Sequence, residues 1–282
     1  INFLYDVKTN PSVTIGRRVA VVGGGNTAMD ACRSARRLGA EQVSVLYRRS
    51  REEMPADSIE IEEATEEGVN FIYLAAPKAI EGNGKVERII CERMQLGEPD
   101  ASGRRSPVPT GETFVLEVDT VIAAVGQGID FSTVPAELHD GRKMKVGKDY
   151  DTPLPGVFVC GDQQTGPKIA IEAIGNGHWA ADSLDHYLTH GTPKKPFFYD
   201  IVQTDLGPED FADVERTTQE HVAHVSGETR LAAPFKEYSK GLTEEQTLRD
   251  AKRCMECGCP DVFECKLRKF ATTHEVQPEK LA

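Results

Sequence analysis

The chain has 282 residues, enough for about two domains, and its 39% hydrophobic and 28% charged residues are ordinary for a globular protein. Its formal net charge of −12 argues against a nucleic-acid or anionic-membrane binder, because those partners are negatively charged themselves. No apolar run approaches the roughly 18 residues of a membrane-spanning helix, and no signal peptide is visible. We therefore expect a cytoplasmic protein without nucleic-acid or membrane partners.

The first half of the chain alternates between strand and helix patterns. After a connector at residues 1–15, the apolar run at 19–22 predicts a buried strand, and residues 26–38 predict a helix. Residues 43–47 are rich in β-branched and aromatic side chains and predict a second strand. Strand, helix and strand within about 30 residues predict a βαβ unit with a parallel pair of strands.

A second helix and strand follow. Residues 57–67 predict a highly charged helix, and residues 69–74 a strand. We expect the acidic run from Glu60 to Glu67 to form a solvated face of that helix.

The pattern then changes to short strands. Residues 80–116 predict a meander of hairpins with one long loop, EPDASGRRSPVP, at 98–109. Another apolar strand is expected at 118–125. The predicted fold class is α/β, with a Rossmann-like dinucleotide-binding domain of parallel sheet plus β-meander over residues 1–126.

The second half is less regular. Residues 127–155 are loop-rich, GVFVCGD contains a predicted strand at 157–160, and a long helix is expected at 169–188. Residues 196–242 are polar and acidic without a clear period, which indicates a linker or a wrapping arm. Thr243 begins TEEQ, a capping-box pattern, so we expect a helix there that leads into a small, helical, cysteine-rich segment at 243–282.

A glycine run, VVGGGNTAMD, joins the first strand to the first helix. Gly23, Gly25 and Ala28 fit the pattern G-x-G-x-x-[GA] in that setting. Gly23 allows a tight turn, Gly25 lets the backbone approach a pyrophosphate, and the free amides of the helix N-terminus favour phosphate. We predict a bound dinucleotide here; a merely structural glycine turn is the alternative.

The end of the second strand indicates which dinucleotide binds. An acidic residue there would bond the ribose hydroxyl of NAD or FAD, but this chain has Arg48 and Arg49. Guanidinium groups match a 2′-phosphate in charge and geometry, so NADPH is the predicted cofactor. The alternative is a solvated basic loop without a ligand.

Four cysteines gather near the C-terminus. The spacing C-x2-C-x-C-x5-C is compact, whereas zinc sites usually have two knuckles farther apart, so a [4Fe–4S] cluster is favoured, with structural zinc and free thiols as alternatives. Cys32, Cys91 and Cys160 lie alone in helix or strand patterns and are expected to be small core residues. The predicted metal ligands are Cys254, Cys257, Cys259 and Cys265.

With GGGNTAMD, LYRRSREEMPA and VFVCGD in one order, the chain resembles the small subunit of NADPH-dependent glutamate synthase and the related flavoprotein modules of anaerobic iron–sulfur enzymes. The resemblance covers roughly residues 1–190. It implies an enzyme in which hydride passes from NADPH to FAD, and electrons then leave singly through iron–sulfur clusters. It also implies an electron-accepting partner, either a glutamate synthase large subunit or a ferredoxin-like module.

The resemblance assigns roles to particular positions. It implies that residues 127–195 are the C-terminal part of an FAD-binding domain. Asp162 matches the segment where an aspartate bonds the ribityl chain of FAD, and the helix start near Ile169 would face the flavin. Hydride transfer needs positioning more than a side-chain acid or base, so no catalytic residue is nominated. The implied cofactor-binding residues are Gly23, Gly24, Gly25, Asn26, Thr27, Ala28, Arg48, Arg49, Gly126, Gly161, Asp162, Ile169 and Ala170.

The chain departs from the family in one respect. Family members carry a further glycine fingerprint for FAD before the NADPH fingerprint, and this sequence has none, so its FAD site is incomplete. We therefore expect either that the chain is a fragment or that the missing part belongs to another polypeptide. One alternative is an NADP(H)-binding electron-transfer or docking module without turnover of its own, and a weaker one is a zinc-stapled scaffold.

Overall fold

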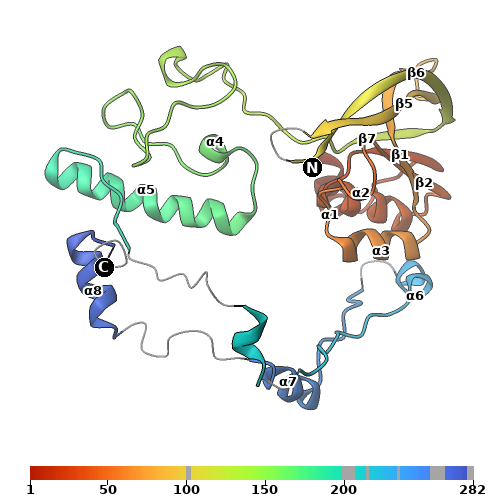
Figure 1. Cartoon of the computed structure of the whole chain (residues 1–282). Helices are drawn as coiled ribbons and strands as arrows, with labels where there is room; N and C mark the ends of the chain where they lie inside the picture. The colour runs from red at the N-terminus through yellow and green to blue at the C-terminus, as the bar shows by residue number, and fades with distance from the viewer. Residues whose placement is uncertain (100–102, 199–206, 214–215, 234–235, 255–263, 278–282) are drawn as a thin grey trace. The chain divides into compact units, whose positions relative to one another are not determined.

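The computed structural model of the chain falls into two units (Figure 1). The first unit comprises residues 1–126 together with 221–243, and the second comprises 127–220 together with 244–282. The described residues are 1–99, 103–198, 207–213, 216–233, 236–254 and 264–277.

A parallel sheet forms the centre of the first unit. Its strand order is β3-β2-β1-β7, and each neighbouring pair is parallel. β1 occupies the middle of the sheet and pairs on both sides, which explains why its run Val19–Val22 is buried throughout. The strands are β1 (Arg18–Val22), β2 (Gln42–Tyr47), β3 (Asn70–Tyr73) and β7 (Thr120–Ala123).

Helices cover one face of this sheet. Val19 and Val21 of β1 pack with the apolar side of α2, whose Met29 and Cys32 are fully buried. The remaining helices of this layer are short, and α6 packs against both α2 and α3. The helices of the unit are α1 (Asn2–Thr9), α2 (Asn26–Arg37), α3 (Ser58–Glu66) and α6 (Gly227–Ala232).

An antiparallel sheet covers the opposite face. Ala20 and Val22 alternate with the helix-facing residues of β1 and pack against Ile89 and Cys91 of this second sheet. A parallel strand with both faces buried must be apolar at every position, as β1 is. The sheet consists of β4 (Ala75–Glu81), β5 (Arg88–Pro99) and β6 (Arg105–Glu117), in the order β4-β5-β6. The predicted α/β class, with a parallel sheet and an antiparallel meander, is confirmed.

Three local predictions were wrong. Residues 1–15 contain helix α1, because Phe3 and Leu4 pack on the core of the first unit. The expected loop at 98–109 is shorter than predicted, since β5 reaches Pro99, β6 begins at Arg105, and these two residues pair. The strand expected at 157–160 is replaced by one isolated bridge between Asp151 and Phe158, because no neighbouring strand extends the pairing.

The second unit has a small core built from loops. Leu138, Met144 and Val159 are its buried apolar residues. Helix α5 runs from Ala170 to His190, close to the predicted bounds, and α7 begins at Glu244 directly after the predicted cap. Within the described ranges, no helix combines the length and apolar character needed to cross a membrane. The helical elements are η1 (Ala136–Leu138), α4 (Asp162–Thr165), α5 (Ala170–His190), η2 (Pro208–Phe211), α7 (Glu244–Ala251) and α8 (Lys266–His274).

Candidate nucleotide-binding site

The glycine turn lies where β1 ends and α2 begins, and its first two glycines are required by the fold. Gly23 has φ +142°, and a Cβ there would lie 2.2 Å from the carbonyl oxygen of Ala124. A Cβ on Gly24 would lie 2.5 Å from the ring of Tyr47. These two positions let the turn pack closely against the chain that follows β7 and against the end of β2.

Gly25 differs, because a Cβ there would meet nothing within 4 Å. Gly25 is the N-cap of α2, and no side chain caps that helix. Asn26 and Thr27 in the first turn are exposed, while Ala28 is fully buried against the sheet. The open space at Gly25 and the uncapped helix N-terminus together fit the pyrophosphate of a dinucleotide.

The loop between β2 and α3 forms a wall beside the glycine turn. The backbone N–H of Asp57 donates to Asn26 Oδ1 at 2.9 Å, and the N–H of Ala56 donates to the carbonyl of Gly24 at 3.0 Å. The hydroxyl of Tyr47 donates to the carbonyl of Glu53 at 2.8 Å. Sequence reasoning missed this wall, although the apolar Met-Pro-Ala triplet inside a charged stretch was a signal for it.

The two arginines at the end of β2 are not equivalent. Arg48 is exposed. Arg49 is only 5% exposed, and its Nε donates to the carbonyl oxygen of Arg105 on β6 at 2.6 Å. Its own carbonyl accepts from the N–H of Leu74 at 3.1 Å. Arg49 thus joins β2 to the antiparallel sheet, and Arg48 presents its guanidinium to solvent.

The residues implied for the flavin lie in the second unit, apart from Gly126, which ends the first segment of the first unit. Gly161, with φ +63°, precedes the one-turn helix α4, and Asp162 Oδ1 accepts a long bond of 3.4 Å from the N–H of Lys168. Ile169 is the N-cap of α5, is 63% exposed, and makes no side-chain capping bond. The helix start is therefore accessible, as is Ala170 beside it.

The cysteine segment is described only in part. Cys254 is exposed, and Cys265 is the N-cap of α8, where its sulfur accepts from the N–H of Arg268 at 3.4 Å. Cys257 and Cys259 lie outside the described residues. Among the residues that the structure describes, no three His, Cys, Asp or Glu side chains gather as metal ligands.

The three solitary cysteines have different surroundings. Cys32 and Cys91 are buried, as predicted, and burial raises the pKa of the Cys32 thiol to about 12. The prediction that Cys160 belongs to the core was wrong, because it is exposed. With no strand formed at 157–160, its side chain is not covered by a sheet layer.

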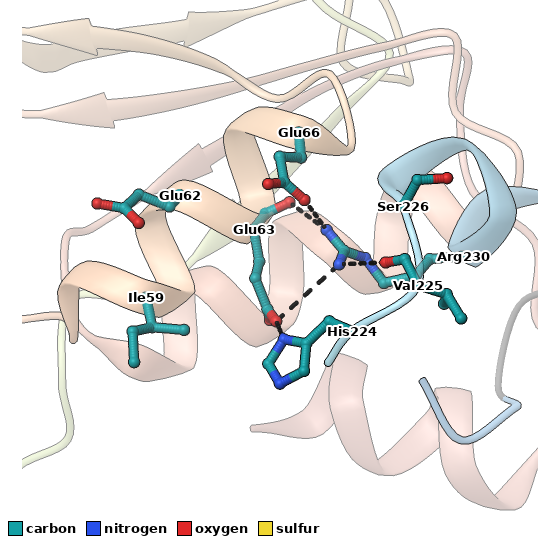
Figure 2. Close-up of a pocket in the computed structure, with 8 residues that line it drawn as sticks. All are labelled: Ile59, Glu62, Glu63, Glu66, His224, Val225, Ser226 and Arg230. Carbon is teal, nitrogen blue, oxygen red and sulfur yellow. Dashed lines mark hydrogen bonds and ion pairs between the residues drawn. The ribbon is translucent and has the colours of Figure 1, made fainter. Parts of the chain in front are cut away.

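A pocket of about 340 Å³ lies elsewhere in the first unit, between α3 and residues 224–230 (Figure 2). Glu63, Glu66 and Arg230 line it with charged groups. Glu62 and Glu66 are exposed, but Glu63 is 5% exposed and Glu67 is 0% exposed, so the prediction of a solvated acidic helix face was wrong for Glu63 and Glu67. Arginines from other elements neutralise these carboxylates and allow their burial.

Comparison with known proteins places the chain among nicotinamide-dependent oxidoreductases. The β subunit of the NADPH-Fe(3+) oxidoreductase of Geobacter sulfurreducens is 36% identical over 293 residues, covering 91% of this chain and 44% of that protein. The β subunit of the NADP(+)-dependent formate dehydrogenase of Moorella thermoacetica is 37% identical, covering 91% and 38%. The glutamate synthase [NADPH] small chain of Escherichia coli is 36% identical, covering 65% and 41%.

The chain thus spans less than half the length of these curated relatives. The first two alignments cover 91% of the chain, so they extend into the part that follows α5.

Solved structures share the fold. Lactococcus lactis thioredoxin reductase matches with a TM-score of 0.52 at 22% identity, covering 65% of this chain and 56% of that chain. The FprA oxidoreductase of Mycobacterium tuberculosis matches with a TM-score of 0.50 at 20% identity, covering 64% and 55%. The family model for pyridine nucleotide-disulphide oxidoreductases matches residues 4–177. The chain belongs to the pyridine nucleotide-disulphide oxidoreductase family, and its relatives include glutamate synthase [NADPH] small chains and β subunits of NADPH-dependent oxidoreductases.

Proposed function

We propose that this chain is part of an NADPH-dependent flavin oxidoreductase of the glutamate synthase small-subunit type. In this proposal residues 1–126 bind NADPH, and residues 127–195 form the C-terminal part of the FAD-binding domain. Residues 196–242 form a linker or a wrapping arm, and residues 243–282 carry an iron–sulfur cluster. The observation that carries the proposal is the open space at Gly25, in front of the uncapped start of α2 and after the strand that ends at exposed Arg48.

The first unit would hold the nicotinamide nucleotide. The free backbone amides of a helix N-terminus point toward the turn that precedes it. In α2 these amides, with the exposed Asn26 and Thr27, would orient the pyrophosphate. The Arg48 guanidinium pairs with the 2′-phosphate. Arg49 supports this loop through its bond to Arg105 and keeps the end of β2 in place.

The second unit would contribute to the flavin site. Asp162 accepts from the ribityl hydroxyls, and the start of α5 at Ile169 and Ala170 directs its partial positive charge at the flavin. When bound, the two cofactors would supply hydride and single-electron transfer chemistry. The chain's own contribution is orientation and exclusion of water, so no side-chain acid or base is assigned.

Cys254, Cys257, Cys259 and Cys265 are proposed to bind a [4Fe–4S] cluster, with zinc as the alternative. The compact spacing supports the cluster. The Geobacter and Moorella relatives are each named as the β subunit of an oxidoreductase, which supports an electron-accepting partner. That partner would be a large subunit of the glutamate synthase kind or a ferredoxin-like module, in the cytoplasm.

A second candidate function is an NADP(H)-binding docking module without turnover of its own. It is favoured by the single glycine fingerprint in these 282 residues. NADPH-dependent reduction of a dye, measured with added FAD alongside NADPH binding by calorimetry, separates the two functions. Turnover that Arg48→Ala abolishes at limiting NADPH supports the oxidoreductase. Tight NADPH binding without turnover supports the docking module, and failure to bind NADPH overturns both.

A further inference from the structure

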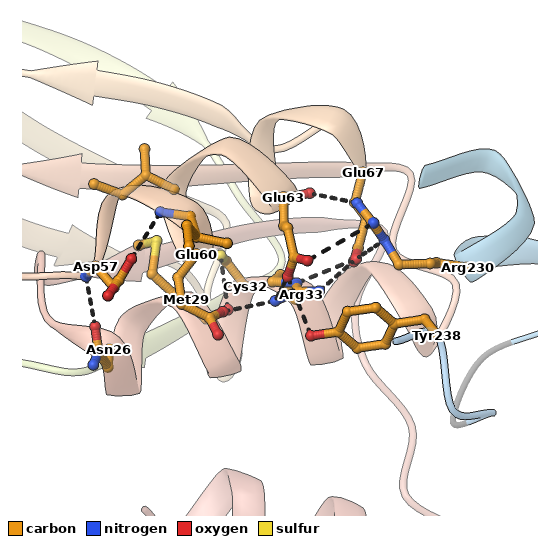
Figure 3. A network of polar contacts seen from close by, with 12 residues as sticks. Asn26, Met29, Cys32, Arg33, Asp57, Glu60, Glu63, Glu67, Arg230 and Tyr238 are labelled. Atoms are coloured by element: carbon orange, nitrogen blue, oxygen red, sulfur yellow. Dashed lines mark hydrogen bonds and ion pairs between the residues drawn. The ribbon is translucent and has the colours of Figure 1, made fainter. Parts of the chain in front are cut away.

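Residues 221–243, here termed the strap, return to the first unit from a distant part of the sequence. They include α6, which packs against α2 and α3. The strap places Arg230 in the interface with only 4% of its surface exposed (Figure 3). An arginine at that level of burial requires ionic partners.

Arg230 has such partners on α3 and at its C-cap. Its Nε lies 2.9 Å from Glu67 Oε1, and its Nη2 lies 2.7 Å from Glu66 Oε2. Its Nη1 donates to the carbonyl of Val225 at 2.9 Å, which ties the strap to itself. The guanidinium therefore joins two carboxylates of the helical layer to the strap backbone.

Two further strap side chains meet at Glu63. His224 Nδ1 lies 2.8 Å from Glu63 Oε1, and the Tyr238 hydroxyl donates to Glu63 Oε2 at 3.2 Å. Three guanidiniums also lie over the ring of Tyr238. The distances from the ring centroid to the Cζ atoms are 5.4 Å for Arg33, 5.6 Å for Arg37 and 5.4 Å for Arg230. Tyr238 thus fills the centre of the charged network.

The partner residues on α2 complete the network. Arg33 lies 2.7 Å from Glu63 and 3.0 Å from Glu67, and Arg37 lies 2.9 Å from Glu67. Burial disfavours the charged form of Glu67, but the hydrogen bonds from Arg37 and Arg33 outweigh it and hold the pKa of this carboxyl below its usual value.

The negative and positive charges between α2 and α3 are more nearly equal in number when the strap is in place. The α3 side contributes Glu60, Glu63, Glu66 and Glu67, whereas α2 contributes Arg33 and Arg37. Arg230 supplies the further cation, and removing it would leave buried carboxylate without enough positive charge.

An independent contact shows that the strap backbone is closely seated. Gly227 is buried, and a Cβ there would lie 2.5 Å from the carbonyl oxygen of Glu66. Backbone-to-backbone packing of this kind needs glycine at the contact. The strap therefore docks by shape as well as by charge.

We propose that the strap is a clasp that tethers the cysteine segment to the nucleotide-binding domain. This inference rests on the proposed function only for the role of the cysteines. Thr243 ends the strap, α7 has eight residues, and Cys254 follows three residues later. At about 1.5 Å per helical residue and about 3.5 Å per extended residue, connectivity alone keeps Cys254 within about 25 Å of Thr243.

The clasp leaves the nucleotide site free. The strap contacts α2 through the ring of Tyr238, which lies against the guanidiniums of Arg33 and Arg37, whereas the glycine turn meets the helix at Asn26. At about 1.5 Å per residue, these contacts lie about 10 to 16 Å along the helix from the turn. Opening the clasp should therefore release the cysteine segment without removing a group that binds NADPH.

Hydrogen exchange of the whole protein tests the clasp. Arg230→Ala should raise exchange of the amides of residues 221–233 by about 100-fold, because it breaks a buried ion pair. Arg249→Ala is the matched control: this arginine, 49% exposed in α7, pairs with Glu220 and Glu245 outside the network. It should leave the strap protected.

Gly227→Ala is a second variant that still tests the clasp if Arg230→Ala unfolds the domain. It disturbs the packing of the strap but retains Arg230 as the partner of the buried carboxylates. It should raise strap exchange while the NADPH dissociation constant stays within about twofold of wild type. A strap that exchanges freely in the wild type, or stays protected in both variants, overturns the clasp. Failure of the proposed function would appear separately, as wild-type protein that binds neither NADPH nor iron while its strap remains protected.

A second readout tests the tether. In protein containing iron and FAD, NADPH should bleach the iron–sulfur absorbance more slowly in Gly227→Ala, by about tenfold, because the cysteine segment loses its high effective concentration near the nucleotide domain. An unchanged bleaching rate, with the strap shown by exchange to be open, overturns the tethering role.

Discussion

Asn26 Oδ1 accepts a hydrogen bond of 2.9 Å from the backbone N–H of Asp57. This bond joins the first turn of α2 to the start of α3 and holds the intervening loop against the glycine turn. The loop follows Arg48 directly, so the bond links the predicted pyrophosphate site to the predicted 2′-phosphate site.

Asn26→Ala should weaken NADPH binding by about fivefold to tenfold, because one hydrogen bond contributes about 1 kcal/mol and its loss loosens the loop. Isothermal titration calorimetry measures the change. Asn70→Ala is the control, since Asn70 is exposed on β3 and its side-chain amide donates a long hydrogen bond of 3.5 Å to the Ser44 hydroxyl. Equal affinities in the two variants would show that the loop does not contribute to binding.

Substitutions of the first and third glycines of the turn should have different effects, one on stability and the other on NADPH binding. Gly23→Ala should lower the free energy of unfolding by about 2 kcal/mol or more, because its φ of +142° and the Ala124 carbonyl leave no room for a methyl group. Gly25→Ala should leave the unfolding free energy nearly unchanged, because its Cβ meets no protein atom, yet weaken NADPH binding by about tenfold or more. Chemical denaturation and calorimetry on both variants check this contrast. Normal NADPH affinity in Gly25→Ala would place the pyrophosphate elsewhere.

Acid should weaken the network around Glu67. The pKa of this carboxyl is lowered in the folded state, so its ionised form contributes stability above the unfolded value near 4.5, and that contribution is lost as the pH falls through the folded pKa. The unfolding free energy should therefore fall below about pH 5. Glu67→Gln should lower the free energy of unfolding by about 3 kcal/mol at pH 7 and should reduce its further decrease at acid pH. Denaturation midpoints between pH 3 and 7 test this prediction. The same decrease of stability at acid pH in the variant as in the wild type would contradict it.

Thiol labelling should report metal ligation. In metal-free protein the exposed Cys160 and Cys254 should react within minutes, whereas the buried Cys32, with a pKa raised to about 12, should react only after unfolding. In protein reconstituted with iron and sulfide, Cys254 should be protected and Cys160, the internal control, should not. Mass spectrometry of the labelled peptides gives the result. Equal labelling of Cys254 with and without metal would remove it from the ligand set.

The elements that sequence reasoning predicted well are those with local signals. The apolar run of β1, the glycine turn before α2 and the start of α7 each depend on a few neighbouring residues and appear where expected. The helix α1 was missed because its stability comes from packing of Phe3 and Leu4 on a distant core, not from its own pattern.

Long-range pairing explains the other misses. Arg230 and Glu67 are 163 positions apart, and no periodicity connects them. The acidic helix face was therefore predicted to be solvated, and residues 196–242 were predicted only as a linker or a wrapping arm. Likewise, Arg48 and Arg49 are alike in sequence, and only the approach of the Arg105 carbonyl from β6 distinguishes them. The sequence predicted which positions form the candidate site, whereas the different surroundings of the two arginines, one exposed and one buried, could not be predicted from it.

The central claim is that Arg48 recognises the 2′-phosphate. The most direct test measures the dissociation constants of NADPH and NADH for wild type and Arg48→Ala, with Arg17→Ala as control because Arg17 precedes β1 and pairs with Glu41. A charge-assisted bond of about 1.5 to 3 kcal/mol predicts a loss of about 10-fold to 100-fold for NADPH and no change for NADH. Equal losses for both nucleotides, or none for either, would contradict the account.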